Sequence, residues 1–120
     1  MHSEAPSGDT TTITRTTARN LLWSFPQMIA HHSTSGCPLQ TGDLLGSGTI
    51  SGLEPGTFGS MLELSEGGKK DILLTGMGVR KFLNDGDTVT IRGFCGESGA
   101  RVGFGECVGN IKPAHLYFLH

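Results

Sequence analysis

The acidic residue Glu63 is the first candidate for chemistry, because it lies among apolar neighbours after a glycine-rich stretch. If this segment is a strand, alternation turns Leu62 and Leu64 toward the core. Glu63 then shares the opposite face with Met61 and Ser65. That face is either solvated, the ordinary environment of a carboxylate, or it lines a pocket. In a pocket, a desolvated carboxylate can orient a base or a ligand. The pocket then shifts the pKa of the carboxylate, and the carboxylate fixes the tautomer of its partner.

A second candidate is Thr49, inside the glycine-rich run from Gly46 to Gly52. The run resembles a phosphate-binding loop only superficially, because it has no lysine and no amphipathic helix after it. Small residues let a backbone approach a ligand closely, so the Thr49 hydroxyl and its neighbouring N–H groups could bind a carboxylate or carbonyl oxygen. The alternative is a glycine-rich bend at a barrel corner. The residues alone favour neither interpretation.

Two adjacent histidines, His31 and His32, precede Cys37 and suggest a metal site or a Cys–His nucleophile. Adjacent residues on a helix point about 100° apart, so the two rings cannot easily share one ion. A place on the helix surface or a capping role at a helix C-terminus is favoured, because a cationic His is stabilised near that end. A nucleophilic pair depends on geometry and not on nearness in sequence. Cys95 and Cys107 show no zinc or redox spacing, which indicates reduced thiols.

A short helix is predicted over residues 24–34, where apolar residues follow helical spacing. Ser24 and Gln27 form a capping box, and Pro26 fits the first turn, where its missing N–H costs nothing. Gly36 is the expected stop.

The rest of the sequence predicts short strands, so the expected fold class is mostly β with one short helix. An extended segment at 10–16 precedes the helix. The clearest tight turn is Asp85-Gly86-Asp87, whose glycine can adopt a positive φ. The predicted strands are residues 44–51, 59–65, 72–75, 88–95 and two pieces within 101–111.

The chain has 120 residues, the length of one domain, and we expect its 19 glycines to lie in turns and bulges. Nine basic and eleven acidic residues give a net charge of −2, so we expect no nucleic-acid partner. No apolar run approaches the roughly 18 residues of a membrane span, and residues 1–12 lack an export signal. We expect a cytoplasmic protein without a membrane partner, with a loose end at 1–9 and an ordered part at 10–120.

A series of motifs resembles one known family in order and spacing. They are HHS, GC, GDLL, SGTISG, EP, FGSMLEL, RKFL, DGD and VGFGEC, between residues 31 and 107. The chain from about residue 10 to 113 resembles the C-terminal part of the fumarylacetoacetases. A "GD" followed by "SGT" is typical of the wider fumarylacetoacetate hydrolase superfamily, whereas "GTISG" followed by "FGSMLEL" is specific to the fumarylacetoacetases proper.

The resemblance implies a hydrolase that cleaves a carbon–carbon bond of fumarylacetoacetate, giving fumarate and acetoacetate at the end of tyrosine and phenylalanine breakdown. In that family a His-activated water attacks a carbonyl, and a carboxylate holds the tautomer of the His. By resemblance, Glu63 matches this catalytic carboxylate and Thr49 matches a substrate-binding threonine. The resemblance also implies a mixed β-sandwich roll, bound Ca²⁺ and Mg²⁺, and a homodimer.

Other parts of that family's site have no match in this chain. The catalytic His, the carboxylate metal ligands and the Lys, Arg and Gln that stabilise the oxyanion lie upstream of the matching region, and neither His31 nor His32 occupies the catalytic position. We therefore expect a truncated gene product, a fragment of the enzyme that is inactive alone. The alternative is a non-catalytic module that keeps only the fold or the dimer interface. A metal-binding domain built on Cys37 and the two histidines is the third class.

Overall fold

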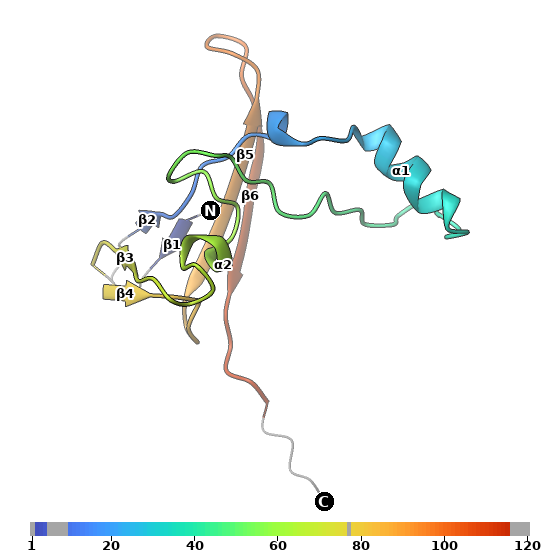
Figure 1. The fold of residues 1–120 in the computed structure, drawn as a ribbon. Coiled ribbons are helices and arrows are strands. Elements are labelled where there is room, and N and C mark those ends of the chain that lie inside the picture. Colours follow the sequence, from blue (N-terminus) through green and yellow to red (C-terminus); the bar gives the residue numbers. More distant parts are fainter. Residues whose placement is uncertain (1, 5–9, 77, 116–120) are drawn as a thin grey trace, which may run out of the picture.

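Two antiparallel sheets form the body of the protein (Figure 1). The computed structural model describes residues 2–4, 10–76 and 78–115. The larger sheet has the order β2-β1-β5-β6, and the smaller one pairs β3 with β4. The strands are β1 (His2–Glu4), β2 (Thr10–Thr12), β3 (Ile72–Leu74), β4 (Gly78–Arg80), β5 (Thr88–Cys95) and β6 (Val102–Asn110).

The helical elements differ in number from the prediction of one helix. They are the 3₁₀ turn η1 (Ala18–Asn20) and the helices α1 (Phe25–Thr34) and α2 (Met61–Leu64). None of the helices in the described ranges has the length and apolarity needed to cross a bilayer.

The predicted helix is confirmed as α1. Ser24 is its N-cap, and the capping box with Gln27 is formed in both directions. Gly36 follows the helix with a φ of 81°, the left-handed conformation that glycine adopts without strain. No residue of α1 is buried, and the helix projects away from the sheets (Figure 1). Local signals in the sequence therefore define α1 without help from a packed core.

The predicted strands have mixed outcomes. Residues 88–95 form β5 as predicted, and 72–75 form β3 with one residue fewer. The two pieces expected within 101–111 are one strand, β6. The prediction of a strand at 44–51 is wrong, because this segment is irregular. The prediction of a strand at 59–65 is also wrong, because this segment contains α2. For residues 1–9, for which we predicted a loose end, the structure describes only the backbone of β1.

The hairpin of β5 and β6 contains a bulge that explains one of its glycines. Arg92 pairs with Glu106 and Phe94 with Gly103, so β6 has one residue more than β5 between the two pairs. Gly105 lies in this extra stretch with a φ of 79°, as a bulge of this kind requires. The bulge keeps the two pairs in register and lets the hairpin continue to Cys95.

The core is small and lies between the two sheets and α2. The buried apolar side chains among the described residues are Ile13, Met61 and Leu74, with Leu64, Ile72 and Leu83 packed against them. Every residue of β6 is exposed. The accessible surface of the chain is 9510 Å², whereas a compact protein of this mass exposes about 6,200 Å². The chain therefore presents about 3,300 Å² more surface than a self-contained domain.

Candidate functional site

The helix α2 positions the predicted site residue Glu63. Its N-cap is Ser60, whose hydroxyl accepts a hydrogen bond from the Glu63 backbone N–H at 3.3 Å. Met61 and Ser65, one helical turn apart, face the interior, whereas Leu62 is 61% exposed. The predicted alternation is therefore wrong for Met61, Leu62 and Ser65, whereas Leu64 packs against the core as predicted. Helical spacing replaces it, and Glu63 lies on the exposed side of the turn.

The Glu63 carboxylate is held by two serine hydroxyls although it is exposed. Ser51 Oγ lies 2.8 Å from both Oε1 and Oε2. Ser60 Oγ lies 2.8 Å from Oε2. These bonds, that of Ser51 foremost, hold the pKa of Glu63 below its ordinary value, because they stabilise the charged form. The carboxylate is therefore ionised and fixed in direction at neutral pH.

The glycine-rich segment with Thr49 packs against the start of α2. Ser51 Oγ accepts a hydrogen bond from the Gly59 N–H at 2.9 Å. A Cβ added at Gly59 would lie 2.5 Å from the carbonyl oxygen of Ile50 and 2.7 Å from Cγ2 of Thr49. Only glycine permits this approach. The structure thus brings the segments of both predicted site residues, Thr49 and Glu63, together, and Thr49 is exposed there.

The other candidates do not assemble into a site. His31 and His32 lie exposed in the last turn of α1, as the helix-surface interpretation predicts, and their ring centroids are 6.1 Å apart. A cavity of about 540 Å³ opens between α1 and residues 46–47, lined by Trp23 and Met28 among others. Cys37, Cys95 and Cys107 are free and exposed. Across the described ranges, no three His, Cys, Asp or Glu side chains gather as metal ligands.

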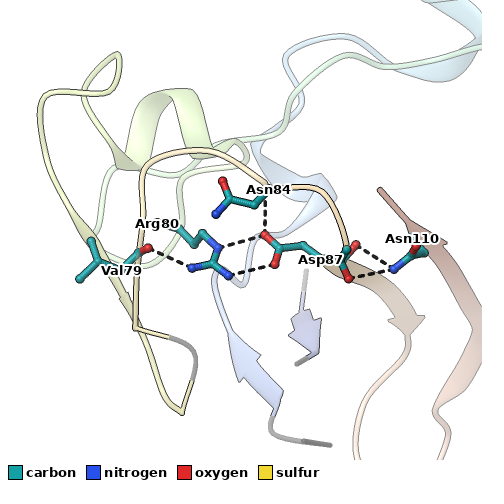
Figure 2. Close-up of polar contacts among 6 residues, drawn as sticks. Val79, Arg80, Asn84, Asp87 and Asn110 are labelled. Atoms are coloured by element: carbon teal, nitrogen blue, oxygen red, sulfur yellow. Dashed lines mark hydrogen bonds and ion pairs between the residues drawn. The ribbon is translucent and has the colours of Figure 1, made fainter. Parts of the chain in front are cut away.

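A charged pair that the sequence did not predict links β4 to the turn before β5. The sequence alone places Arg80 with Lys69, Lys70 and Lys81 on a solvated hairpin face. The structure instead shows Arg80 Nε and Nη2 each 3.1 Å from an oxygen of Asp87 (Figure 2). Their side chains are only 19% and 8% exposed. The signal was the turn at 85–87, because an aspartate closing a tight turn is placed to accept local hydrogen bonds.

Further contacts fix Asp87 in this position. Its Oδ2 accepts the backbone N–H of Asn84 at 2.8 Å, and its carbonyl oxygen accepts the Ile111 N–H at 2.8 Å. Asn110 Nδ2 donates to the carbonyl of Gly86 at 2.9 Å (Figure 2). The hydrogen bond from Arg80 is the main reason that the pKa of Asp87 lies below its usual value. This network is structural, since it joins the two sheets through one turn.

Comparison with known proteins agrees with the motif resemblance. The protein-family model that describes the C-terminal region of fumarylacetoacetate (FAA) hydrolase matches residues 7–112. The chain is 58% identical over 107 residues to the fumarylacetoacetase of Aspergillus fumigatus, covering 89% of this chain and 25% of that protein. It is 52% identical over 105 residues to the fumarylacetoacetase of Homo sapiens, covering 88% and 25%.

A relative from a nematode gives the same result. The fumarylacetoacetase of Caenorhabditis elegans is 49% identical over 113 residues, which are 92% of this chain and 27% of that protein. The chain spans about a quarter of the length of these curated relatives. With nearly its whole length matched by the family model, the chain belongs to the fumarylacetoacetate hydrolase family and corresponds to the C-terminal region of fumarylacetoacetases.

Proposed function

We propose that this chain supplies the C-terminal quarter of a fumarylacetoacetase that hydrolyses a carbon–carbon bond of fumarylacetoacetate to fumarate and acetoacetate. In this proposal Glu63 is the carboxylate that orients the catalytic His, and Thr49 binds the substrate. The observation that carries it is the joint placement of the two segments, with Ser51 bonded to Glu63 at 2.8 Å. A single contact thus ties the carboxylate to the substrate-binding turn.

The geometry of Glu63 suits an orienting role. A carboxylate that must remain charged beside an imidazole benefits from hydrogen-bond donors that lower its pKa. Ser51 and Ser60 provide such donors. The carboxylate is also exposed, so it can receive a partner from a segment outside this chain. An ionised, directed and accessible acid is what a His–Glu pair requires.

The divalent cations implied by the family do not find their ligands in the described residues. Carboxylate oxygens are the usual ligands of Ca²⁺ and Mg²⁺. The acidic residues described here do not form a group of three with other donors. We therefore expect the chain alone to be inactive even with either ion added.

A chimera tests the proposal. Residues 10–113 would replace the matching quarter of the Aspergillus fumigatus enzyme, to which the chain is 58% identical. We expect an active chimera in which Glu63→Gln lowers kcat by about 10²- to 10⁴-fold, because the amide no longer stabilises the imidazolium. Thr49→Val should raise KM between about twofold and tenfold, the effect of one lost hydrogen bond.

The matched control is Glu66→Gln, which removes a neighbouring exposed carboxylate that pairs with Lys70 at 3.8 Å. It should leave kcat within about twofold, because an exposed ion pair contributes little. Activity is followed as loss of the diketone absorbance. Full activity of Glu63→Gln in an active chimera would refute the catalytic role, and turnover by the isolated chain above the buffer blank would refute its inactivity.

A second candidate function is a non-catalytic association module, and the exposure of β6 favours it. This edge strand carries Val102, Phe104 and Val108, each more than half exposed. The outer edge of β6 pairs with no strand of the described residues, and such an edge is a template for pairing with another strand. Sedimentation velocity of the chain and of Phe104→Lys would test this function. If the chain is a monomer at all concentrations, self-association is excluded. A dimer of the parent chain that is lost in Phe104→Lys would support the association function.

A further inference from the structure

The hydroxyl of Ser51 makes two different connections at once. It accepts the backbone N–H of Gly59 at 2.9 Å and donates to the Glu63 carboxylate, with 2.8 Å to each oxygen. Accepting from the amide orients the hydroxyl group, so that its one proton points toward the carboxylate. A proton placed between the two oxygens leaves the outer lone pair of Oε1 available to another donor, whereas Oε2 also accepts from Ser60 at 2.8 Å. Ser51 thus restrains the carboxylate without covering it.

Ser60 contacts the same carboxylate but has another task. Its hydroxyl caps α2 by accepting the Glu63 N–H, so its loss would disturb the helix itself. Ser51 belongs to a different segment, twelve residues before Glu63 and two residues after Thr49. Its contact with the carboxylate is therefore separable from the formation of α2. Through this contact, the position of the Glu63 carboxylate depends on that of the segment that contains Thr49.

We propose that Ser51 is the positioning residue of Glu63, fixing the direction of its carboxylate toward an incoming basic partner. This inference rests on the proposed function, because the partner is the His that Glu63 would orient. An exposed glutamate has three rotatable bonds, and without a second anchor it would sample several rotamers. The Ser51 hydroxyl supplies that anchor from the substrate-binding segment. Substrate binding and orientation of the base are then linked through one side chain.

The first test is a titration of the chain itself by NMR, following the Glu63 side-chain carboxyl carbon. In Ser51→Ala the pKa of Glu63 should move up toward its ordinary value, whereas in Ser51→Thr, which keeps the hydroxyl, it should stay near that of the parent. The matched control is Ser47→Ala, because Ser47 Oγ donates only to the neighbouring Gly48 carbonyl among the hydrogen bonds of the described residues. Unchanged backbone shifts in α2 show that the helix remains. An unmoved Glu63 pKa in Ser51→Ala would overturn the proposal.

The second test uses the active chimera. Ser51→Ala should lower kcat about tenfold, the smaller effect seen when a group that orients a functional side chain is removed. KM should stay within about twofold, and the acid limb of the pH profile should move to higher pH, because the carboxylate must be ionised. Ser51→Thr should restore both. A loss that Ser51→Thr does not restore would assign Ser51 a purely structural role and overturn the proposal.

The two proposals fail in different ways. If Glu63→Gln keeps full activity, the proposed function is wrong, whatever Ser51 does to the pKa of Glu63. If Glu63→Gln is impaired while Ser51→Ala has the kcat and pH profile of the parent, only the positioning role is wrong.

Discussion

Removing Arg80 should loosen the junction between the two sheets without unfolding the hairpin. In Arg80→Met the Asp87 carboxylate, 8% exposed, loses two hydrogen bonds of 3.1 Å and keeps, among the described residues, the one from the Asn84 N–H. In the reverse variant, Asp87→Asn, the guanidinium is 19% exposed and can regain water more easily. We therefore expect Arg80→Met to destabilise the junction more than Asp87→Asn does.

The size of the effect follows from the burial of the pair. Breaking a fully buried ion pair costs about 3–5 kcal/mol, whereas an exposed pair contributes about 0–1 kcal/mol. The Arg80–Asp87 pair is bidentate but lies near the surface, so we expect about 2 kcal/mol. At 1.4 kcal/mol for each factor of ten, this corresponds to about 30-fold faster exchange of amides protected by this junction.

Hydrogen exchange measures this directly. The Gly86 N–H, bonded to the Ile111 carbonyl at 2.8 Å, reports on the junction. The control is Lys81→Met, which removes an exposed contact with Asp71 at 3.8 Å and should change exchange by less than about twofold. In a double-mutant cycle with Asp87→Asn, the double variant should lose less stability than the sum of the losses in the two single variants. Additive effects, or an Arg80→Met rate within twofold of the parent, would refute the reasoning.

Three further predictions follow from local geometry. Folding lowers the pKa of Asp87, so its contribution to stability is present above its ordinary pKa and is lost as the pH falls through the lowered value. In a series of urea-unfolding measurements at different pH, Asp87→Asn should therefore weaken the dependence of stability on pH below about pH 4. Gly59→Ala should cost about 1–3 kcal/mol in the same assay and shift the Ile50 NMR signals, whereas Gly46→Ala, with no atom within 4 Å of the new Cβ, should leave them in place. Ser24→Ala removes the hydroxyl that accepts the Gln27 N–H, so it should cost α1 about 1 kcal/mol and lower helicity by circular dichroism, and unchanged helicity would contradict the capping role.

The sequence predicted the elements that carry their own local signals. The capping box at Ser24 defined α1, and the β-rich run after the turn at 85–87 defined β5. The same capping signature occurs at Ser60 and Glu63, but alternation of apolar residues over so short a segment favoured a strand. Four helical residues are too few for the 3.6-residue period to stand out from a period of two. Reading Ser60 as an N-cap would have found α2.

The sequence could nominate candidate site residues, but it could not predict their contacts. The motif resemblance selected Thr49 and Glu63, and the structure places their segments together. The connection through Ser51 depends on the path of an irregular segment, for which periodicity holds no information. Arg80 was misjudged for a related reason, since a basic residue in a charged stretch is usually solvated. Its partner Asp87 is seven residues away and reaches it only through the turn at 85–87.

The large accessible surface of the chain has a thermodynamic consequence. With 9510 Å² exposed at 12.7 kDa, folding of this chain removes about 8,900 Å² from water, against about 12,200 Å² for a compact domain of that mass. The heat-capacity change of unfolding scales with this area, so it should be about three quarters of the usual value for 120 residues. The unfolding enthalpy falls with the same buried area and sets the steepness of the transition, so thermal unfolding of the chain should be broad, and a polypeptide that covers the exposed face of β6 should sharpen it.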